Sequence, residues 1–189
     1  ADQYRTPVMI LGDGMMGQMM EPVVFPEPLD VRRLPTKAWR LDGAKGRPSR
    51  VIKSLLLDPA VEEELNWKLV RKYEAIKLSL PRAERYMTED ALLVVVAYGT
   101  AARIAKGAIK ALREQGLRVG LFRPITLFPY PEQLLRDLSR TVRHFLVFEM
   151  STGQLVEAVR LSLEGRGRVH FYGRPGGIIP TPHEVSKVL

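Results

Sequence analysis

The chain has 189 residues, 46% of them hydrophobic and 26% charged, which is typical of a globular protein that can bury a core. It contains no cysteine, which excludes disulfides, cysteine-bound zinc and iron–sulfur ligation within these residues. The first residues form no basic, apolar leader and no segment approaches about 18 uninterrupted apolar residues, so we expect a cytoplasmic protein that is not bound to a membrane.

The N-terminal stretch "PVMILGDGMMGQMMEP" contains the spacing of a dinucleotide-binding loop, with glycines at Gly12, Gly14 and Gly17. Such a loop needs a full helix after it and then a second strand, but Pro22 and further prolines end any helix after little more than one turn. A strand over residues 8–11, a tight turn and a short Met-rich helix fit this stretch better. NAD binding stays open as a hypothesis that rests on the three glycines alone.

The next segment, residues 30–57, is a connector that carries much of the formal net charge of +8. Residues 31–50 hold seven Lys or Arg against one acidic residue, Asp42. Trp39 is the only aromatic residue among them, so the stacking series of a single-strand nucleic-acid binder is absent and we expect no nucleic-acid partner. We interpret this basic segment as solvated or facing another subunit, with a site for an anionic cofactor or an acidic partner as the alternative.

A helix is predicted from residue 59 to about residue 80. Asp58 suits the N-cap, Pro59 the first helical position, and three glutamates follow at the positive end of the helix dipole. Pro81 ends the helix. The apolar stripe of this helix consists of Val61, Leu65, Leu69, Tyr73 and Ile76.

From residue 88 onward, apolar strands alternate with amphipathic helices. The predicted strands are "ALLVVVAYG", "LRVGLFRP", "HFLVFEM" and "RVHFYGRPGG". The predicted helices are "TAARIAKGAIKALREQG", "PYPEQLLRDLSR", "TGQLVEAVRLSLEG" and "TPHEVSKVL". This alternation predicts an α/β fold in which a parallel-rich sheet lies between two layers of helices, a three-layer α/β/α domain.

In a parallel sheet, ligands and partners meet the carboxyl ends of the strands. Polar residues that follow the predicted strands are candidates for contact with an anion or another subunit: Thr100, Arg123, Glu149, Ser151, Gln154 and Arg174. We expect Glu149 and the arginines to form ion pairs across a subunit boundary. No nucleophile–base set, paired catalytic carboxylates, phosphate-cradling loop or metal-ligand spacing is present, so this domain by itself is predicted to bind or assemble rather than to catalyse.

Several of these motifs together resemble a known family. The combination of "AYGTAARIAK", "RPITLFPYP" and "EMSTGQ" is similar to the C-terminal part of the alpha subunit of 2-oxoacid:ferredoxin oxidoreductases, most of all the 2-oxoisovalerate (branched-chain) type. The resemblance implies that residues 1–29 are the tail of a pyrimidine-binding domain for thiamine diphosphate. It also implies that residues 30–87 are a basic connector and helix, and that residues 88–189 form a transketolase C-terminal-like domain. The chain is then a fragment of a larger subunit.

The resemblance also implies the chemistry of the whole enzyme. The complex would use thiamine diphosphate and Mg²⁺ to convert a 2-oxo acid and coenzyme A to acyl-CoA and CO2, and would reduce ferredoxin through iron–sulfur clusters on other subunits. No catalytic or cofactor-binding residue is carried over to this chain, which we expect to be inactive alone. The substrate stays open between branched-chain 2-oxo acids, 2-oxoglutarate and pyruvate, and the alternative function is a free-standing α/β module that binds an anionic ligand or a protein.

Overall fold

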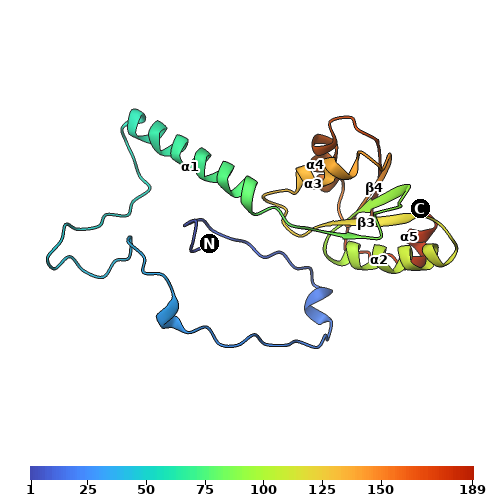
Figure 1. The fold of residues 1–189 in the computed structure, drawn as a ribbon, viewed down its shortest axis with the longest axis horizontal. Coiled ribbons are helices and arrows are strands. Elements are labelled where there is room, and N and C mark those ends of the chain that lie inside the picture. Colours follow the sequence, from blue (N-terminus) through green and yellow to red (C-terminus); the bar gives the residue numbers. More distant parts are fainter. The chain divides into compact units, whose positions relative to one another are not determined.

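The computed structural model describes residues 1–189. The chain divides into two compact units, one made of Ala1–Gln18 and Lys72–Leu189 and the other of Met19–Arg71. No helix combines the length and apolar character that a membrane crossing requires. The predicted α/β architecture lies in the first unit (Figure 1).

The centre of the first unit is a five-stranded sheet with the order β1-β3-β2-β4-β5. The strands are β1 (Ala83–Tyr86), β2 (Leu93–Val96), β3 (Val119–Pro124), β4 (His144–Glu149) and β5 (Arg168–Gly173). Strands β2 to β5 pair in parallel, and β1 alone is antiparallel, against β3. The predicted parallel-rich sheet is therefore confirmed.

Helices pack on both faces of this sheet. Helix α2 (Gly99–Glu114) and α5 (Pro182–Ser186) share one apolar core, and α3 (Glu132–Leu138) and α4 (Gln154–Leu163) share the other. Strand β2 contributes to both cores, because successive side chains of a strand point to opposite faces: Val94 and Val96 lie in the α3–α4 core and Val95 in the α2–α5 core. Burial on both faces explains why β2 is a continuous apolar run.

Helix α1 spans Pro59–Ser79, as predicted from its signals at both ends. The Asp58 carboxylate accepts a hydrogen bond from the Ala60 N–H at 2.9 Å and thereby caps the helix. Among the predicted apolar stripe, Ile76 is buried and Val61 is exposed.

Two segments differ from the sequence-based prediction. Residues 7–13 form no strand, and the predicted Met-rich helix is reduced to a short 3₁₀ turn at Met16–Gln18. A strand is stable only beside a neighbour, and Ile10 of this segment is 94% exposed. Conversely, β1 was not predicted, because its polar residues "AERY" carry no apolar run; it forms as an edge strand on β3.

The secondary structure that a dinucleotide-binding loop requires is also absent around the three glycines. The strand that should precede Gly12 and the full helix that should follow Gly17 are both missing from residues 1–29. A backbone cradle for a pyrophosphate requires both elements.

Candidate functional site

The carboxyl ends of the four parallel strands lie along one edge of the sheet, as the sequence predicted. The register pairs Val96 of β2 with Phe122 of β3, and Glu149 of β4 with Gly173 of β5. The six predicted contact residues lie at or just after these strand ends: Arg123 in β3, Glu149 in β4, Thr100 in α2, Gln154 in α4, and Ser151 and Arg174 in the loops. The structure shows that several of them already have partners within the chain.

Glu149 is an internal residue, 2% exposed, at the end of β4. Its carboxylate accepts hydrogen bonds from the N–H groups of Leu155 at 3.0 Å and Val156 at 3.1 Å, and also from the Ser151 hydroxyl. These two N–H groups belong to the first turn of α4, which has no side-chain cap of its own. Glu149 therefore caps α4 from the preceding strand, and its predicted ion pair across a subunit boundary stays a prediction.

Thr100 lies in the first turn of α2 and is buried. Its hydroxyl, followed by the Met16 N–H, holds the pKa of Asp13 below the ordinary value of that carboxyl. A carboxylate at the start of α2 is also favoured by the helix dipole.

Arg123 belongs to a three-residue ion-pair network at the outer side of the sheet. Its Nη1 lies 2.9 Å from the Glu84 carboxylate, whose other oxygen lies 2.8 Å from Lys106 Nζ. Lys106 first, and Arg123 second, hold the pKa of Glu84 below its ordinary value. Glu84 and Arg123 are direct partners in the β1–β3 register, so the unpredicted strand β1 supplies the partner of a predicted contact residue.

Arg174 is partly exposed and Gln154 is exposed. Arg174 Nη1 lies 3.1 Å from the Tyr172 hydroxyl and 3.4 Å from the Glu184 carboxylate, and both neighbours contribute to raising the pKa of Arg174. Glu184 in turn forms the capping box of α5 with Thr181. Gln154 is exposed at the first residue of α4. Among the six predicted residues, Gln154 is exposed, and the side chains of Arg123 and Arg174 remain 43% and 30% exposed, so these three can meet a partner.

A separate cleft of about 620 Å³ lies between the end of α1 and the segment that contains the "LFPYP" motif. Its lining includes Phe128 and Tyr130 together with the charged groups of Lys77, Glu132 and Arg136. The Tyr130 hydroxyl is buried without a hydrogen-bond partner, and burial raises the pKa of this phenol. Sequence reasoning identified the motif but not the cleft, because the cleft requires α1 to pack beside it.

The acidic side chains at and beside this sheet edge form helix caps and ion pairs within the chain. Each of Glu84, Glu149 and Glu184 is engaged by N–H groups or cations within the chain. No group of three or more His, Cys, Asp or Glu side chains is placed to hold a metal ion.

Comparison with known proteins shows the family of this chain. Residues 91–185 match the family model of the pyruvate:ferredoxin oxidoreductase core domain II. The ketoisovalerate oxidoreductase subunit VorB of Methanothermobacter marburgensis is 42% identical over 94% of this chain and 50% of its own length. The chain belongs to the 2-oxoacid:ferredoxin oxidoreductase family. The resemblance seen in its motifs is confirmed.

Other members of the 2-oxoacid:ferredoxin oxidoreductase family are also similar to this chain. The 2-oxoglutarate synthase subunit KorA of Methanothermobacter thermautotrophicus is 28% identical over the whole chain and 57% of its own length. A structure of 2-oxoglutarate:ferredoxin oxidoreductase from Magnetococcus marinus matches 70% of this chain and 23% of its own, with a TM-score of 0.61 at 22% identity. That likeness shows the fold, in agreement with the predicted transketolase C-terminal-like domain. The chain spans about half the length of the curated relatives it matches.

Proposed function

We propose that this chain is a non-catalytic, assembly-supporting portion of a thiamine diphosphate-dependent 2-oxoacid:ferredoxin oxidoreductase. The assembled enzyme converts a 2-oxo acid and coenzyme A to acyl-CoA and CO2 and reduces ferredoxin. The observation that carries this proposal is the 42% identity to VorB over 94% of the chain. The internal use of Glu149 as a helix cap supports the non-catalytic role, because the most buried acid at the sheet edge is occupied by backbone N–H groups.

The same relative favours a branched-chain 2-oxo acid as the substrate. VorB is named a ketoisovalerate oxidoreductase subunit, whereas KorA, at 28% identity, is named a 2-oxoglutarate synthase subunit. The test is reduction of ferredoxin by the complete complex with coenzyme A and each of 2-oxoisovalerate, 2-oxoglutarate and pyruvate. We expect the highest kcat/KM with 2-oxoisovalerate, and higher values with either other acid would overturn this assignment.

The residues of this chain do not fit thiamine diphosphate as a complete site. Mg²⁺, which would accompany the diphosphate, needs several oxygen ligands, and no suitable carboxylate group is assembled here. Asp13, the acid nearest to the glycine motif, faces the beginning of α2 instead. No step of the cofactor's chemistry is therefore assigned to a residue of this chain.

Calorimetry tests whether this chain or the complete complex binds the cofactor. We expect the isolated chain to show no binding of thiamine diphosphate with Mg²⁺ and no turnover of a 2-oxo acid, whereas the complete complex binds and turns over. Micromolar binding by the isolated chain would contradict the proposal. The alternative, a free-standing module, would be supported if the source protein contained neither a thiamine-binding domain nor further subunits.

A further inference from the structure

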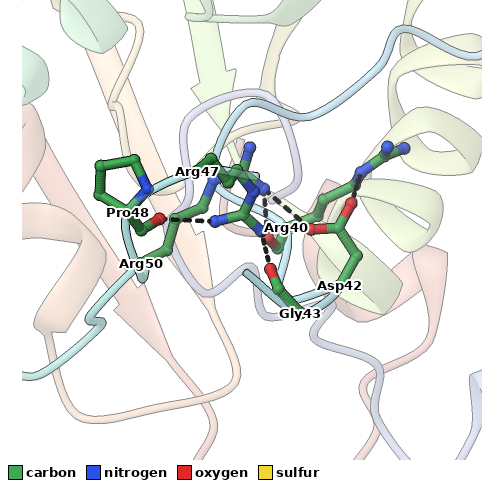
Figure 2. Close-up of polar contacts among 6 residues, drawn as sticks. All are labelled: Arg40, Asp42, Gly43, Arg47, Pro48 and Arg50. Atoms are coloured by element: carbon green, nitrogen blue, oxygen red, sulfur yellow. Dashed lines mark hydrogen bonds and ion pairs between the residues drawn. The ribbon is translucent and has the colours of Figure 1, made fainter. Parts of the chain in front are cut away.

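The second unit, Met19–Arg71, contains a dense cluster of arginines around one carboxylate. Asp42 Oδ1 lies 2.6 Å from Arg47 Nη2 and 3.2 Å from Arg50 Nη1, and Asp42 Oδ2 accepts from Arg40 Nε (Figure 2). Arg47 also donates to the carbonyls of Gly43 and Pro48. These contacts fold residues 40–50 into a compact loop without a helix or strand.

The cluster holds more positive charge than Asp42 neutralises. Three guanidinium groups surround one carboxylate, and Arg47, followed by Arg40, holds the pKa of Asp42 below its ordinary value. Arg40 reaches Asp42 through Nε, while its two Nη groups point away from the carboxylate in Figure 2. A guanidinium fork is suited to a second carboxylate, because its donors match the spacing of the two oxygens.

The same arrangement occurs a second time in the connector. Asp30 lies 3.0 Å from Arg32 Nε and 3.7 Å from Arg33 Nε, and both arginine side chains are 88% exposed. Here too one carboxylate meets more than one guanidinium. Both aspartates of the connector show that its arginines bind carboxylates. Around each aspartate, positive charge remains in excess.

Large apolar side chains alternate with these charged residues along the sequence and are exposed to solvent. They are Leu29, Val31, Leu34, Leu41, Val51 and Ile52, each at least 50% exposed. An exposed apolar series interleaved with arginines is typical of a protein–protein interface, where arginine is enriched and apolar side chains are removed from water. A phosphate polymer would pair with the arginines but leave this apolar surface in water, whereas a protein segment covers both.

We propose that residues 29–52 form a docking strip for an acidic, apolar-containing segment of another subunit of the oxidoreductase. The proposal rests on the proposed function, since it needs a multi-subunit complex. Carboxylates of the partner pair with the Nη groups of Arg40 and with Arg33, whose single contact with Asp30 is 3.7 Å long. Apolar side chains of the partner cover the exposed leucine and valine residues between them. Arg47 and Arg50 hold the strip in shape through Asp42 and the backbone.

The first test measures assembly of the complete complex with Arg40→Glu and with Lys45→Glu. Lys45 is a matched control because it is exposed in the same loop, undergoes the same charge change and takes no part in the Asp42 cluster. Sedimentation at low and high salt reports the dissociation constant. We expect Arg40→Glu to weaken assembly by at least about tenfold at low salt and by less at high salt, and Lys45→Glu to change it by less than about twofold.

Arg40→Lys keeps the charge but removes the planar fork, so an intermediate loss is expected. Equal effects of Arg40→Glu and Lys45→Glu would mean that only net charge matters and would overturn the proposal. So would assembly that is unchanged by Arg40→Glu.

The second test identifies the occupant. A photo-crosslinking residue in place of Leu41 in the complete complex should join this chain to another subunit, at a segment with several Asp or Glu residues. Crosslinks only within the same subunit, only to nucleic acid, or to a segment without acidic residues would each overturn the docking proposal. The wild-type complex is assayed in parallel for ferredoxin reduction by 2-oxo acids. A wild-type complex that does not reduce ferredoxin counts against the proposed function. An active complex that gives one of the contradicting crosslinks counts against the docking strip alone.

Discussion

The N–H of Leu155 donates a hydrogen bond to the carboxylate of Glu149 at 3.0 Å, so the end of β4 caps the beginning of α4. Glu149 also binds the next N–H, that of Val156, and is 2% exposed. A buried carboxylate that satisfies two backbone donors stabilises the domain, because those donors would otherwise be desolvated without an acceptor. This arrangement gives Glu149 a role within the domain, and its predicted contact across a subunit boundary stays a prediction.

Removal of this cap should destabilise the isolated chain. We expect Glu149→Ala to lower the free energy of unfolding by about 3 kcal/mol and Glu149→Gln by about 1–2 kcal/mol, measured by urea denaturation at pH 7. The control is Glu157→Gln, an exposed acid in the first turn of the same helix, with an expected change within about 0.5 kcal/mol. An unchanged stability in Glu149→Gln together with impaired assembly would restore the interface role.

The Glu84 network should make a small, pH-dependent contribution to stability. Its pKa is lowered in the folded chain by Lys106 and then Arg123, so the stabilisation is present above the ordinary carboxyl pKa of 4.5 and disappears as the pH falls through the lowered value. Because all three side chains are partly exposed, Glu84→Gln should cost about 0–1 kcal/mol at pH 7. Urea denaturation from pH 7 to pH 3 measures this, and a larger difference at pH 3 than at pH 7 would contradict it.

Two glycines provide a matched pair of backbone tests. A Cβ on Gly120 of β3 would lie 2.6 Å from the Met87 carbonyl oxygen, which is backbone and cannot move aside. A Cβ on Gly107 of α2 would make only ordinary contacts, at 3.5 Å, with the Pro182 ring. Gly120→Ala should therefore destabilise the chain by roughly 1–3 kcal/mol, and Gly107→Ala should stabilise it by about 0.5–1 kcal/mol through helix propensity. Thermal unfolding of both variants gives the comparison, which fails if the two shifts share a sign.

The N-terminal residues should be the least protected part of the isolated chain. Residues 1–29 contain no helix or strand apart from the 3₁₀ turn at Met16–Gln18, and their large apolar side chains are mostly exposed, for example Ile10 and Phe25. Hydrogen exchange should be fast there and slow in β2 and β4, whose side chains are buried on both faces. Assembly into the complete complex should slow exchange in residues 1–29, and strong protection in the monomeric chain would contradict this expectation.

Arg174 and Gln154 carry the remaining prediction for the sheet edge. Arg174→Ala should change the stability of the isolated chain little, because its contacts with Tyr172 and Glu184 are partly exposed. If the edge meets another subunit, Arg174→Ala and Gln154→Ala should weaken assembly while leaving the melting temperature nearly unchanged. Sedimentation of the complex and calorimetry of the chain together measure this, and normal assembly of both variants would remove the edge from the interface.

The sequence by itself determined the elements whose signals are local. Helix α1 begins at Pro59 because Asp58 suits the N-cap and Pro59 suits the first helical position. Strand β2 can be recognised from the sequence because a strand buried on both faces is a continuous apolar run. Strand–helix alternation then determined the parallel sheet and brought the four strand ends to one edge. The family motifs were likewise contiguous in the chain.

Only the tertiary structure decided the features that depend on a distant partner. Strand β1 is polar and exists because β3 offers it a free edge, while residues 8–11 are apolar and remain without a strand because nothing pairs with them. Glu149 becomes a helix cap only when the chain turns so that the N–H groups of α4 face it. In each case the structure depends on hydrogen bonds to backbone groups that are distant in the sequence or that face the residue only after the chain turns. The type of a side chain alone does not specify where those backbone groups lie.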